Sequence, residues 1–380
     1  MIRRPAIAFG LLHAGLALTR SLGRAGIPVC GVVLTDSDFG LASRYLSRRA
    51  RVSTDEQALA AMREIARESR PIVFPERDEH VELILRRWEE VAAVADVPLP
   101  GDPDVVRRLR RKELLPIMAT TADVPVPRTV AASSEDAVRA AGLQPPFLVK
   151  PAEGQGFALA FGHKVVVADT VDEAVAAWRR AREHGFETIV QELIPGSHER
   201  VFSLFTYIGR GGEPLASVVG RKVRQGPLRF GTSAVFEARH DPTVLELGQR
   251  LLLTAGYRGF AHVEFAHDPR DGLFKLLEVN TRLPVWAGLG MTRGFDMARL
   301  AYDDLCGRQV EPLGLLPDGT TWIYLGKDVW VSAQMARRRE LGPGRFLGPY
   351  LRRRKVRATL ALDDLRPAVA SLAYLRSRAG

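Results

Sequence analysis

Two apolar stretches joined by a short turn sequence restrict the fold of this chain more than any other feature. GFAHVEFAHD and LFKLLEVNTRL are each long enough for a strand, and the turn residues of HDPRDG lie between them. This pattern predicts an antiparallel hairpin. Because side chains alternate along a strand, Glu278, Asn280 and Arg282 should lie in a row on one face. The chain should therefore contain an antiparallel sheet with a polar row built into an apolar strand.

Glu264, in HVEF, is a second lone carboxylate inside an apolar strand. In the register that pairs Glu264 with Leu276, Glu264 and Glu278 lie on the same face, one diagonal apart, and a slip of one residue would separate them. Two carboxylates and the amide oxygen of Asn280 are hard oxygen ligands that suit Mg²⁺ or Mn²⁺, and phosphate oxygens can complete the shell. The sequence predicts a metal site here; the alternative is an ordinary surface strand with a Glu–Arg pair.

Lysines and glycines upstream suit the phosphate groups that such a metal would accompany. Lys150 ends the strand PFLVK, and a segment expected to form a hairpin, with Gly154 and Gly156, follows it. Small residues there would let backbone N–H groups approach phosphate. Lys112, in RRKELL, is a second candidate. A surface hairpin and a solvated helix face are the respective alternatives, because the segment matches neither G-x-x-x-x-G-K-[ST] nor G-x-G-x-x-G.

Two further segments carry polar candidates. The strand TIVQELI runs into a Pro-Gly hinge whose backbone groups can meet an adenine edge, and Glu199 after it is placed for ribose hydroxyls. The hinge candidates are Gln191, Glu192, Leu193 and Ile194. The segment GRKVRQGPLRFGTS supplies three cations that can clamp a γ-phosphate and a substrate carboxylate, or can simply form a solvated basic strand: Arg221, Lys222 and Arg224.

The pattern of strands and helices divides the chain into blocks. Residues 1–104 alternate short apolar strands with amphipathic helices, which predicts a doubly wound α/β domain. Residues 105–307 mix helices with antiparallel hairpins, which predicts an α+β core, and VVRRLRRKELLPIMAT within it should be one helix. Residues 308–380 form a small C-terminal extension. In this extension, residues 337–357 hold nine basic side chains and one acidic side chain.

The composition is that of a soluble globular protein with an excess of positive charge. The 380 residues are 46% hydrophobic and 26% charged, and the net charge of +10 suits an anionic partner. The two cysteines have no spacing motif. No segment has the roughly 18 apolar residues of a membrane span, and MIRRPAIAFGLLHAGLAL should open a β-α-β unit instead of acting as a signal peptide. We therefore expect a cytoplasmic protein.

Taken in order, these segments resemble the ATP-grasp superfamily over roughly residues 105–305. HVEF and LLEVNTR resemble its metal-binding E…E-x-N-x-R pattern, while LVKP and QELIPG resemble its lysine strand and nucleotide hinge. The whole layout, with SRY early in the chain and KELL followed by DVPVPRT, is most similar to predicted ATP-dependent carboxylate–amine ligases, among which D-aspartate ligases fall. One departure is the glycine loop AEGQGFALAFG, which lacks a G-S-x-G core.

The resemblance implies a domain plan and a reaction. A pre-ATP-grasp domain (1–104) would precede a nucleotide lid (105–187), a metal-binding lobe (188–307) and the basic extension (308–380). The cofactors would be ATP and Mg²⁺ (or Mn²⁺), and the reaction would join a small carboxylate to an amine through an acyl phosphate, releasing ADP and phosphate. The implied roles are phosphate binding by Lys112 and Lys150, nucleoside binding by Glu192 and Glu199, binding of two Mg²⁺ by Glu264, Glu278 and Asn280, and acyl-group orientation by Arg282.

Other interpretations of the sequence remain open at this point. AIAFGLLHAG could begin a dinucleotide site, but Leu11 and Leu12 stand where a backbone must approach a ligand. The basic segment 337–357 is either a solvated surface or a surface for an anionic substrate or, weakly, a membrane. The main alternative function is a basic protein that binds nucleic acid or a membrane surface with a degenerate, non-catalytic ATP-grasp fold. Nucleic acid is the less expected partner, and a homodimer is an open prediction.

Overall fold

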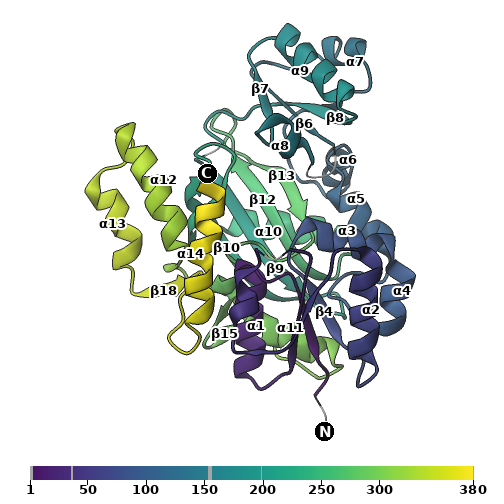
Figure 1. Ribbon diagram of the computed structural model, residues 1–380. Coiled ribbons are helices and arrows are strands. Elements are labelled where there is room, and N and C mark those ends of the chain that lie inside the picture. Colours follow the sequence, from purple (N-terminus) through teal and green to yellow (C-terminus); the bar gives the residue numbers. More distant parts are fainter. Residues whose placement is uncertain (1–2, 36, 153–155, 198, 380) are drawn as a thin grey trace.

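The computed structural model describes residues 3–35, 37–152, 156–197 and 199–379 (Figure 1). The first domain is a parallel sheet with the strand order β3-β2-β1-β4. Its strands are β1 (Ala6–Phe9), β2 (Val29–Val33), β3 (Leu46–Arg51) and β4 (Ile72–Pro75). Its helices are α1 (His13–Arg24), α2 (Asp55–Ala66), α3 (Asp78–Arg86) and α4 (Trp88–Val94), with a short 3₁₀ turn η1 (Phe39–Ala42). Strands β1, β2 and β4 are fully buried, as parallel strands covered by helices must be, so the doubly wound prediction is confirmed.

The prediction that VVRRLRRKELLPIMAT forms one helix was wrong. The structure has two short helices, α5 (Pro103–Arg110) and α6 (Leu115–Thr121). Pro116 lies in the first turn of α6, where a proline is tolerated; inside one long helix it would remove a backbone hydrogen bond and clash with the preceding turn. The break places Lys112 in a turn between the two helices.

A small antiparallel sheet forms the upper lobe in Figure 1. Its strands are β5 (Thr129–Ala131), β6 (Phe147–Pro151), β7 (Val166–Ala168) and β8 (Thr188–Glu192), in the order β5-β8-β6-β7. Helices α7 (Glu135–Arg139), α8 (Gly156–Phe161) and α9 (Val171–Glu183) complete it. β6 and β7 pair as the predicted hairpin requires, but α8 lies in their connection and begins at Gly156. Gly154 lies outside the described residues.

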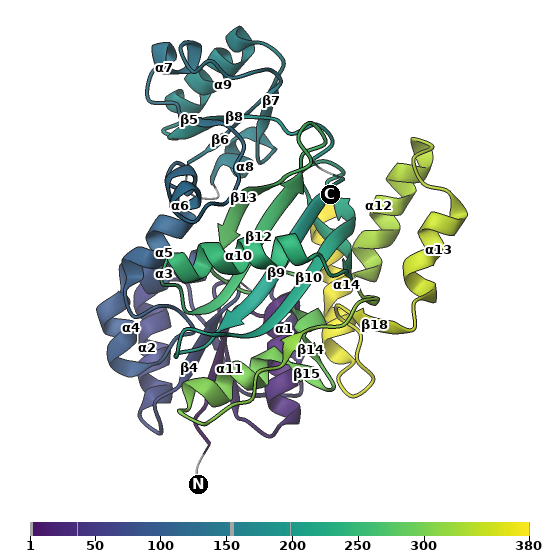
Figure 2. The ribbon, with the colours of Figure 1, turned by 180° about the vertical axis from the view of Figure 1, so that it is seen from behind.

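The central sheet has the order β13-β12-β9-β10-β11-β17-β18, and β16 pairs with β10. Its strands are β9 (Val201–Ile208), β10 (Pro214–Gly226), β11 (Thr232–Ala238), β12 (Gly259–His267), β13 (Phe274–Asn280), β16 (Gly314–Leu315), β17 (Thr320–Ile323) and β18 (Arg354–Arg357). Helix α10 (Pro242–Thr254) crosses one face of the sheet (Figure 2). β14 (Met291–Thr292), β15 (Phe295–Asp296), the 3₁₀ turn η2 (Ala287–Gly290) and α11 (Met297–Leu305) follow β13.

The C-terminal extension is continuous with this sheet. It supplies β17 and β18 at one edge, with α12 (Leu325–Arg337) and α13 (Pro343–Leu351) between them and α14 (Arg366–Ala379) at the end. α14 lies beside the first domain (Figure 1). A buried ion pair of 2.9 Å joins Arg20 Nε of α1 to Asp364 Oδ2, which also accepts a hydrogen bond from Ser43 Oγ. Among the described helices, none has the length and hydropathy needed to cross a bilayer.

Candidate active site

The hairpin of β12 and β13 brings the two predicted carboxylates together. Glu264 lies directly opposite Glu278, and His262 lies opposite Asn280. The expected register, with Glu264 opposite Leu276, was wrong, because an irregularity after Glu264 makes Phe265 the partner of Leu276 and leaves Leu277 unpaired. Between Glu264 and Glu278 the error is two residues, so both carboxylates still share a face.

The polar row on β13 is hydrogen-bonded along its length. Asn280 Nδ2 donates to Glu278 Oε1 at 2.9 Å, and Arg282 Nη2 donates to Asn280 Oδ1 at 3.2 Å. Arg282 Nη2 also donates to Asp78 Oδ2 at 2.8 Å, at the start of α3. Arg110 of α5 pairs with the other oxygen of Asp78 at 3.0 Å. The first domain thus fixes the end of the row through one carboxylate.

Cations surround the paired carboxylates. Burial would raise the pKa of Glu278, but the hydrogen bond from Asn280 and the charges of Lys112, Lys164 and Lys222 lower that pKa to about 2. Lys222 Nζ lies 2.9 Å from Glu264 Oε1. The metal-ligand candidates are therefore held among positive groups that also suit the oxygens of a phosphate chain.

Two lysines line the cleft with this row, Lys150 from the upper lobe and Lys112 from the turn between α5 and α6. Lys150 of β6 is buried, and its Nζ donates to Gln191 Oε1 at 2.9 Å. Burial and the nearby charge of Lys112 lower the pKa of Lys150 to about 8, against the opposing effect of Glu278. Lys112 Nζ donates to the carbonyl of Pro151 at 3.2 Å. Both lysines line the same cleft as Glu264 and Glu278, and their role as phosphate ligands stays a prediction.

The hinge candidates on β8 and directly after it point in different directions. Gln191 contacts Lys150 and also donates to Thr129 Oγ1 at 2.7 Å. The side chain of Glu192 accepts hydrogen bonds from the backbone N of Gln144 at 3.0 Å and from Arg128 at 3.3 Å. Since neighbouring side chains on a strand alternate, Gln191 faces the lysines and Glu192 faces away. Leu193 N donates to the carbonyl of Pro146, and Ile194 is buried.

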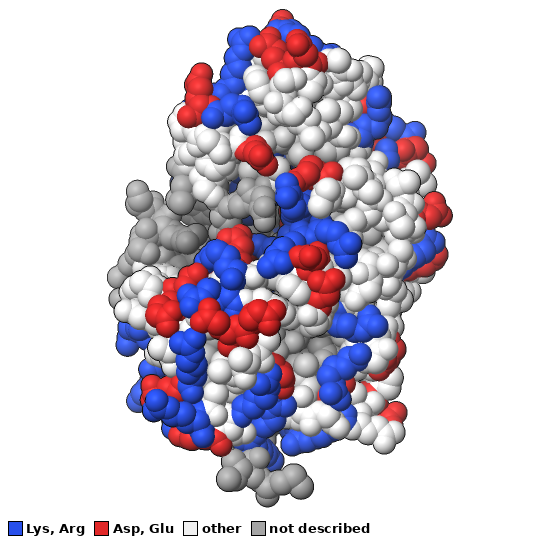
Figure 3. Space-filling view, turned by 90° about the vertical axis from the view of Figure 1, so that its right-hand side faces the viewer, with Lys and Arg blue, Asp and Glu red and all other residues white. Residues whose placement is uncertain are grey.

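A cleft of about 450 Å³ lies between the upper lobe and the central sheet. On the side of the molecule shown in Figure 3, Lys and Arg side chains gather at mid-height beneath the upper lobe. The predicted residues that line the cleft are Lys112, Lys150, Gln191, Lys222, Glu264, Glu278, Asn280 and Arg282. Three other predicted residues line a second cavity: Glu199, Arg221 and Arg224. The structure therefore brings together most of the predicted phosphate and metal residues.

Sequence reasoning missed several side chains of the cleft: Asp78, Arg110, Lys164, His262 and Trp286. Asp78 follows the carboxyl end of β4, where the ligands of parallel sheets gather, so FPERDEH carried a usable signal. Trp286 stacks on Phe236 with ring centroids 3.7 Å apart and lies edge-on to His262. Burial lowers the pKa of His262 to about 4, so this imidazole is neutral at neutral pH.

The donor set fits a hard divalent cation that shares its shell with phosphate. Within the described ranges, no three His, Cys, Asp or Glu side chains are gathered as metal ligands. Glu264 and Glu278 lie opposite each other, with Asn280 beside them, and Mg²⁺ commonly takes only one or two protein carboxylates. The residues present thus suit a metal that arrives with a nucleotide.

Comparison with curated proteins finds amino-acid ligases. The chain is 25% identical over 239 residues to a D-aspartate ligase of Enterococcus faecium (strain Aus0004), and the match covers 60% of this chain and 56% of the relative. It is 31% identical over 165 residues to a D-alanine–D-alanine ligase of Stutzerimonas stutzeri (strain A1501), covering 42% and 50%. The matches thus span about half the length of these two relatives. No family model matches the chain.

Comparison with solved structures shows the same fold over most of the chain. An ADP complex of N5-carboxyaminoimidazole ribonucleotide synthetase has a TM-score of 0.64 at 15% identity, covering 82% of this chain and 79% of that one. The biotin carboxylase domain dimer of 2-oxoglutarate carboxylase from Hydrogenobacter thermophilus, with MgADP and bicarbonate, has a TM-score of 0.65 at 15% identity, covering 84% and 73%. An L-amino acid ligase from Bacillus licheniformis has 0.59 at 17% identity, covering 80% and 74%. The chain is therefore an ATP-grasp-fold protein, distantly homologous to D-aspartate ligase and D-alanine–D-alanine ligase.

Proposed function

We propose that this chain is an ATP-dependent carboxylate–amine ligase that forms an amide or peptide bond and releases ADP and phosphate. The observation that carries the proposal is the Glu264–Glu278 pair facing Lys112 and Lys150 across one cleft. The names of the curated relatives, both amino-acid ligases, support it. ADP or MgADP in two proteins of the same fold supports a nucleotide in this cleft.

The chemistry requires charge neutralisation and alignment, which the lining residues can supply. A carboxylate oxygen of the first substrate attacks the γ-phosphorus, the bond to ADP breaks, and an acyl phosphate forms. The amine of the second substrate then attacks the acyl carbon, loses a proton, and displaces phosphate. Lys112 and Lys150 would hold the phosphates, and Arg282, fixed by Asp78 at 2.8 Å, would orient the acyl group. Mg²⁺ held by Glu264, Glu278 and Asn280 would neutralise phosphate charge.

Product analysis with pooled amino acids and carboxylates tests this proposal. We expect Mg²⁺-dependent release of ADP and phosphate, and added hydroxylamine should trap the acyl phosphate as a hydroxamate of the acid substrate. AMP and pyrophosphate as products would refute the acyl-phosphate route. Absence of turnover with nucleotide still bound would instead favour the non-catalytic alternative.

A further inference from the structure

A second cavity, of about 910 Å³, lies where the C-terminal extension meets the central sheet. β10, β11 and β17 form one wall, and the segment from the end of α12 through α13 forms the other. Both this volume and the 450 Å³ of the cleft fall in the range of small-molecule sites. Seven cationic side chains and three carboxylates line this second cavity. It is therefore large enough for a separate ligand and carries an excess of positive charge.

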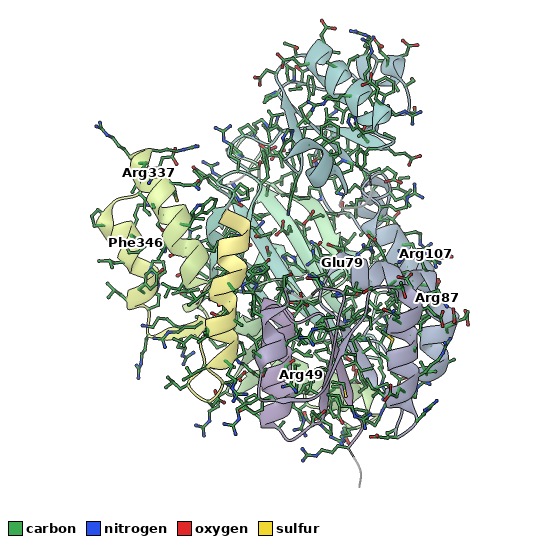
Figure 4. All side chains as sticks on the ribbon, in the orientation of Figure 1. Arg49, Glu79, Arg87, Arg107, Arg337 and Phe346 are labelled. Carbon is green, nitrogen blue, oxygen red and sulfur yellow. The ribbon has the colours of Figure 1, made fainter. Side chains whose placement is uncertain are left out.

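A buried ion pair holds the two walls together. Arg224 of β10 donates to both oxygens of Asp328 on α12, at 2.5 and 2.8 Å, and to the carbonyls of Arg345 and Phe346. Tyr350 of α13 donates to the same carboxylate. Figure 4 shows Phe346 on α13, the outer of the two helices α12 and α13. Because these groups are satisfied by one another, Arg224 serves to position α13, and the cavity has a fixed shape.

Several cations in the cavity lack a full complement of carboxylate partners. Glu237 is shared by Arg221, at 3.3 Å, and Arg352, at 2.5 Å. Arg221 Nε is buried and, within the described residues, has no hydrogen-bond partner. Two other arginines of the cavity lining, Arg229 and Arg338, have no carboxylate within ion-pair distance among the residues that the structure describes. Guanidinium groups in this state favour carboxylate or phosphate ligands, which they can bind in a bidentate manner.

The cavity meets the cleft at two residues. Lys222 and Gln225 line both spaces, and Lys222 Nζ lies 2.9 Å from Glu264 Oε1. A ligand held by the cavity arginines can therefore extend one end past Lys222 to the proposed metal site.

We infer that this cavity binds the second substrate, an amine that carries two or more carboxylate or phosphate groups. The role as second substrate rests on the proposed ligase function, whereas the anion site does not. The inference also assigns a function to part of the basic segment 337–357, because Arg338, Arg345 and Arg352 of this segment line the cavity.

Calorimetric binding of two small anions tests the site. Citrate, a tricarboxylate, and inorganic pyrophosphate distinguish the two anion chemistries. The test variant is Arg338→Glu/Arg345→Glu, which reverses two exposed cavity charges. Its matched control is Arg337→Glu/Arg353→Glu, with the same charge change at exposed positions outside the lining; Arg337 lies at the far end of α12 in Figure 4. We expect the wild type and the control to bind at least one anion, and the test variant to bind it at least tenfold more weakly.

Three results would overturn the inference: no binding of either anion by the wild type, equal weakening in both double variants, or loss of binding in Lys150→Met but not in the test variant. MgADP binding, measured on the same proteins, separates this inference from the ligase proposal. The test variant should bind MgADP like the wild type. If the wild type binds citrate or pyrophosphate through the arginines but does not bind MgADP, the ligase proposal fails and the anion site stands.

Discussion

Asp78→Asn should reveal how strongly the first domain fixes the cleft. The carboxylate lies 2.8 Å from Arg282 and 3.0 Å from Arg110, and about one fifth of its side chain is exposed. Removing one member of a buried ion pair costs about 3–5 kcal/mol. Because the site is partly hydrated and asparagine can still accept a hydrogen bond, we expect a loss of about 2–3 kcal/mol. Arg282 would also lose its orientation, so kcat/KM of the proposed reaction should fall about 10–100-fold.

Glu82→Gln is the matched control for this change. Glu82 pairs with Arg110 at 3.1 Å, and this pair contributes about 1 kcal/mol or less because Glu82 is about one third exposed. Urea unfolding at pH 7 gives both losses in stability. If Asp78→Asn is no more destabilising than Glu82→Gln, the reasoning about a fixed Arg282 is refuted.

The pH dependence gives an independent check on Asp78. Burial opposes its ionisation, but Arg282 and Arg110 hold the pKa of Asp78 well below its usual range. An acid with a depressed pKa in the folded state contributes stability above its unfolded pKa, and this contribution is lost as the pH falls. The difference between the wild type and Asp78→Asn should therefore be full at pH 7 and smaller at pH 3. A difference that grows on acidification would contradict the assignment.

Two further outcomes concern residues of the cleft, and a third concerns the exposed basic segment 337–357. Glu278→Ala should lower turnover about a thousandfold or more, measured as phosphate release, because a carboxylate that we propose as a metal ligand is lost; near-normal activity with a much lower melting temperature would make Glu278 structural. Since the pKa of Lys150 is about 8, ATP affinity should fall about tenfold from pH 7 to pH 9 as the free lysine loses its proton, and Lys150→Arg should abolish this dependence in calorimetry. Anionic vesicles should retain the protein weakly at low salt through the exposed part of residues 337–357, and equal retention by neutral vesicles would exclude this contact.

The period of the hairpin explains why the sequence could predict that Glu264 and Glu278 share a face. Alternation fixes which side chains share a face. A shift of two residues from the predicted register therefore still leaves Glu264 and Glu278 on the same face. The register itself was not predictable. The bulge leaves Leu277 unpaired, and LFKLLEVN contains no glycine or proline to mark it.

Other parts of the site depend on tertiary contacts that local patterns do not record. Every residue of β8 is buried, so neither face of this strand is marked by exposure to water. The sequence therefore could not show that Gln191, and not Glu192, faces the cleft. The second cavity exists because Arg224 meets Asp328, 104 residues later in the chain. Arg224 was predicted as a substrate ligand from its basic surroundings, and we now propose a positioning role for it.

The contact between Arg20 and Asp364 has a consequence for the order of synthesis. Within the described residues, the hydrogen-bond acceptors of the buried Arg20 guanidinium lie 339 to 344 residues later in the chain: the carboxylate and carbonyl of Asp364 and the carbonyl of Thr359. When the ribosome has finished the first domain, none of these groups exists, and an unpaired buried cation costs several kcal/mol. α1 should therefore stay open to water until Thr359 and Asp364 have been synthesised, and a chain stopped before Thr359 should be cut within α1 by added protease. A protease-resistant first domain thus reports that synthesis has passed Asp364.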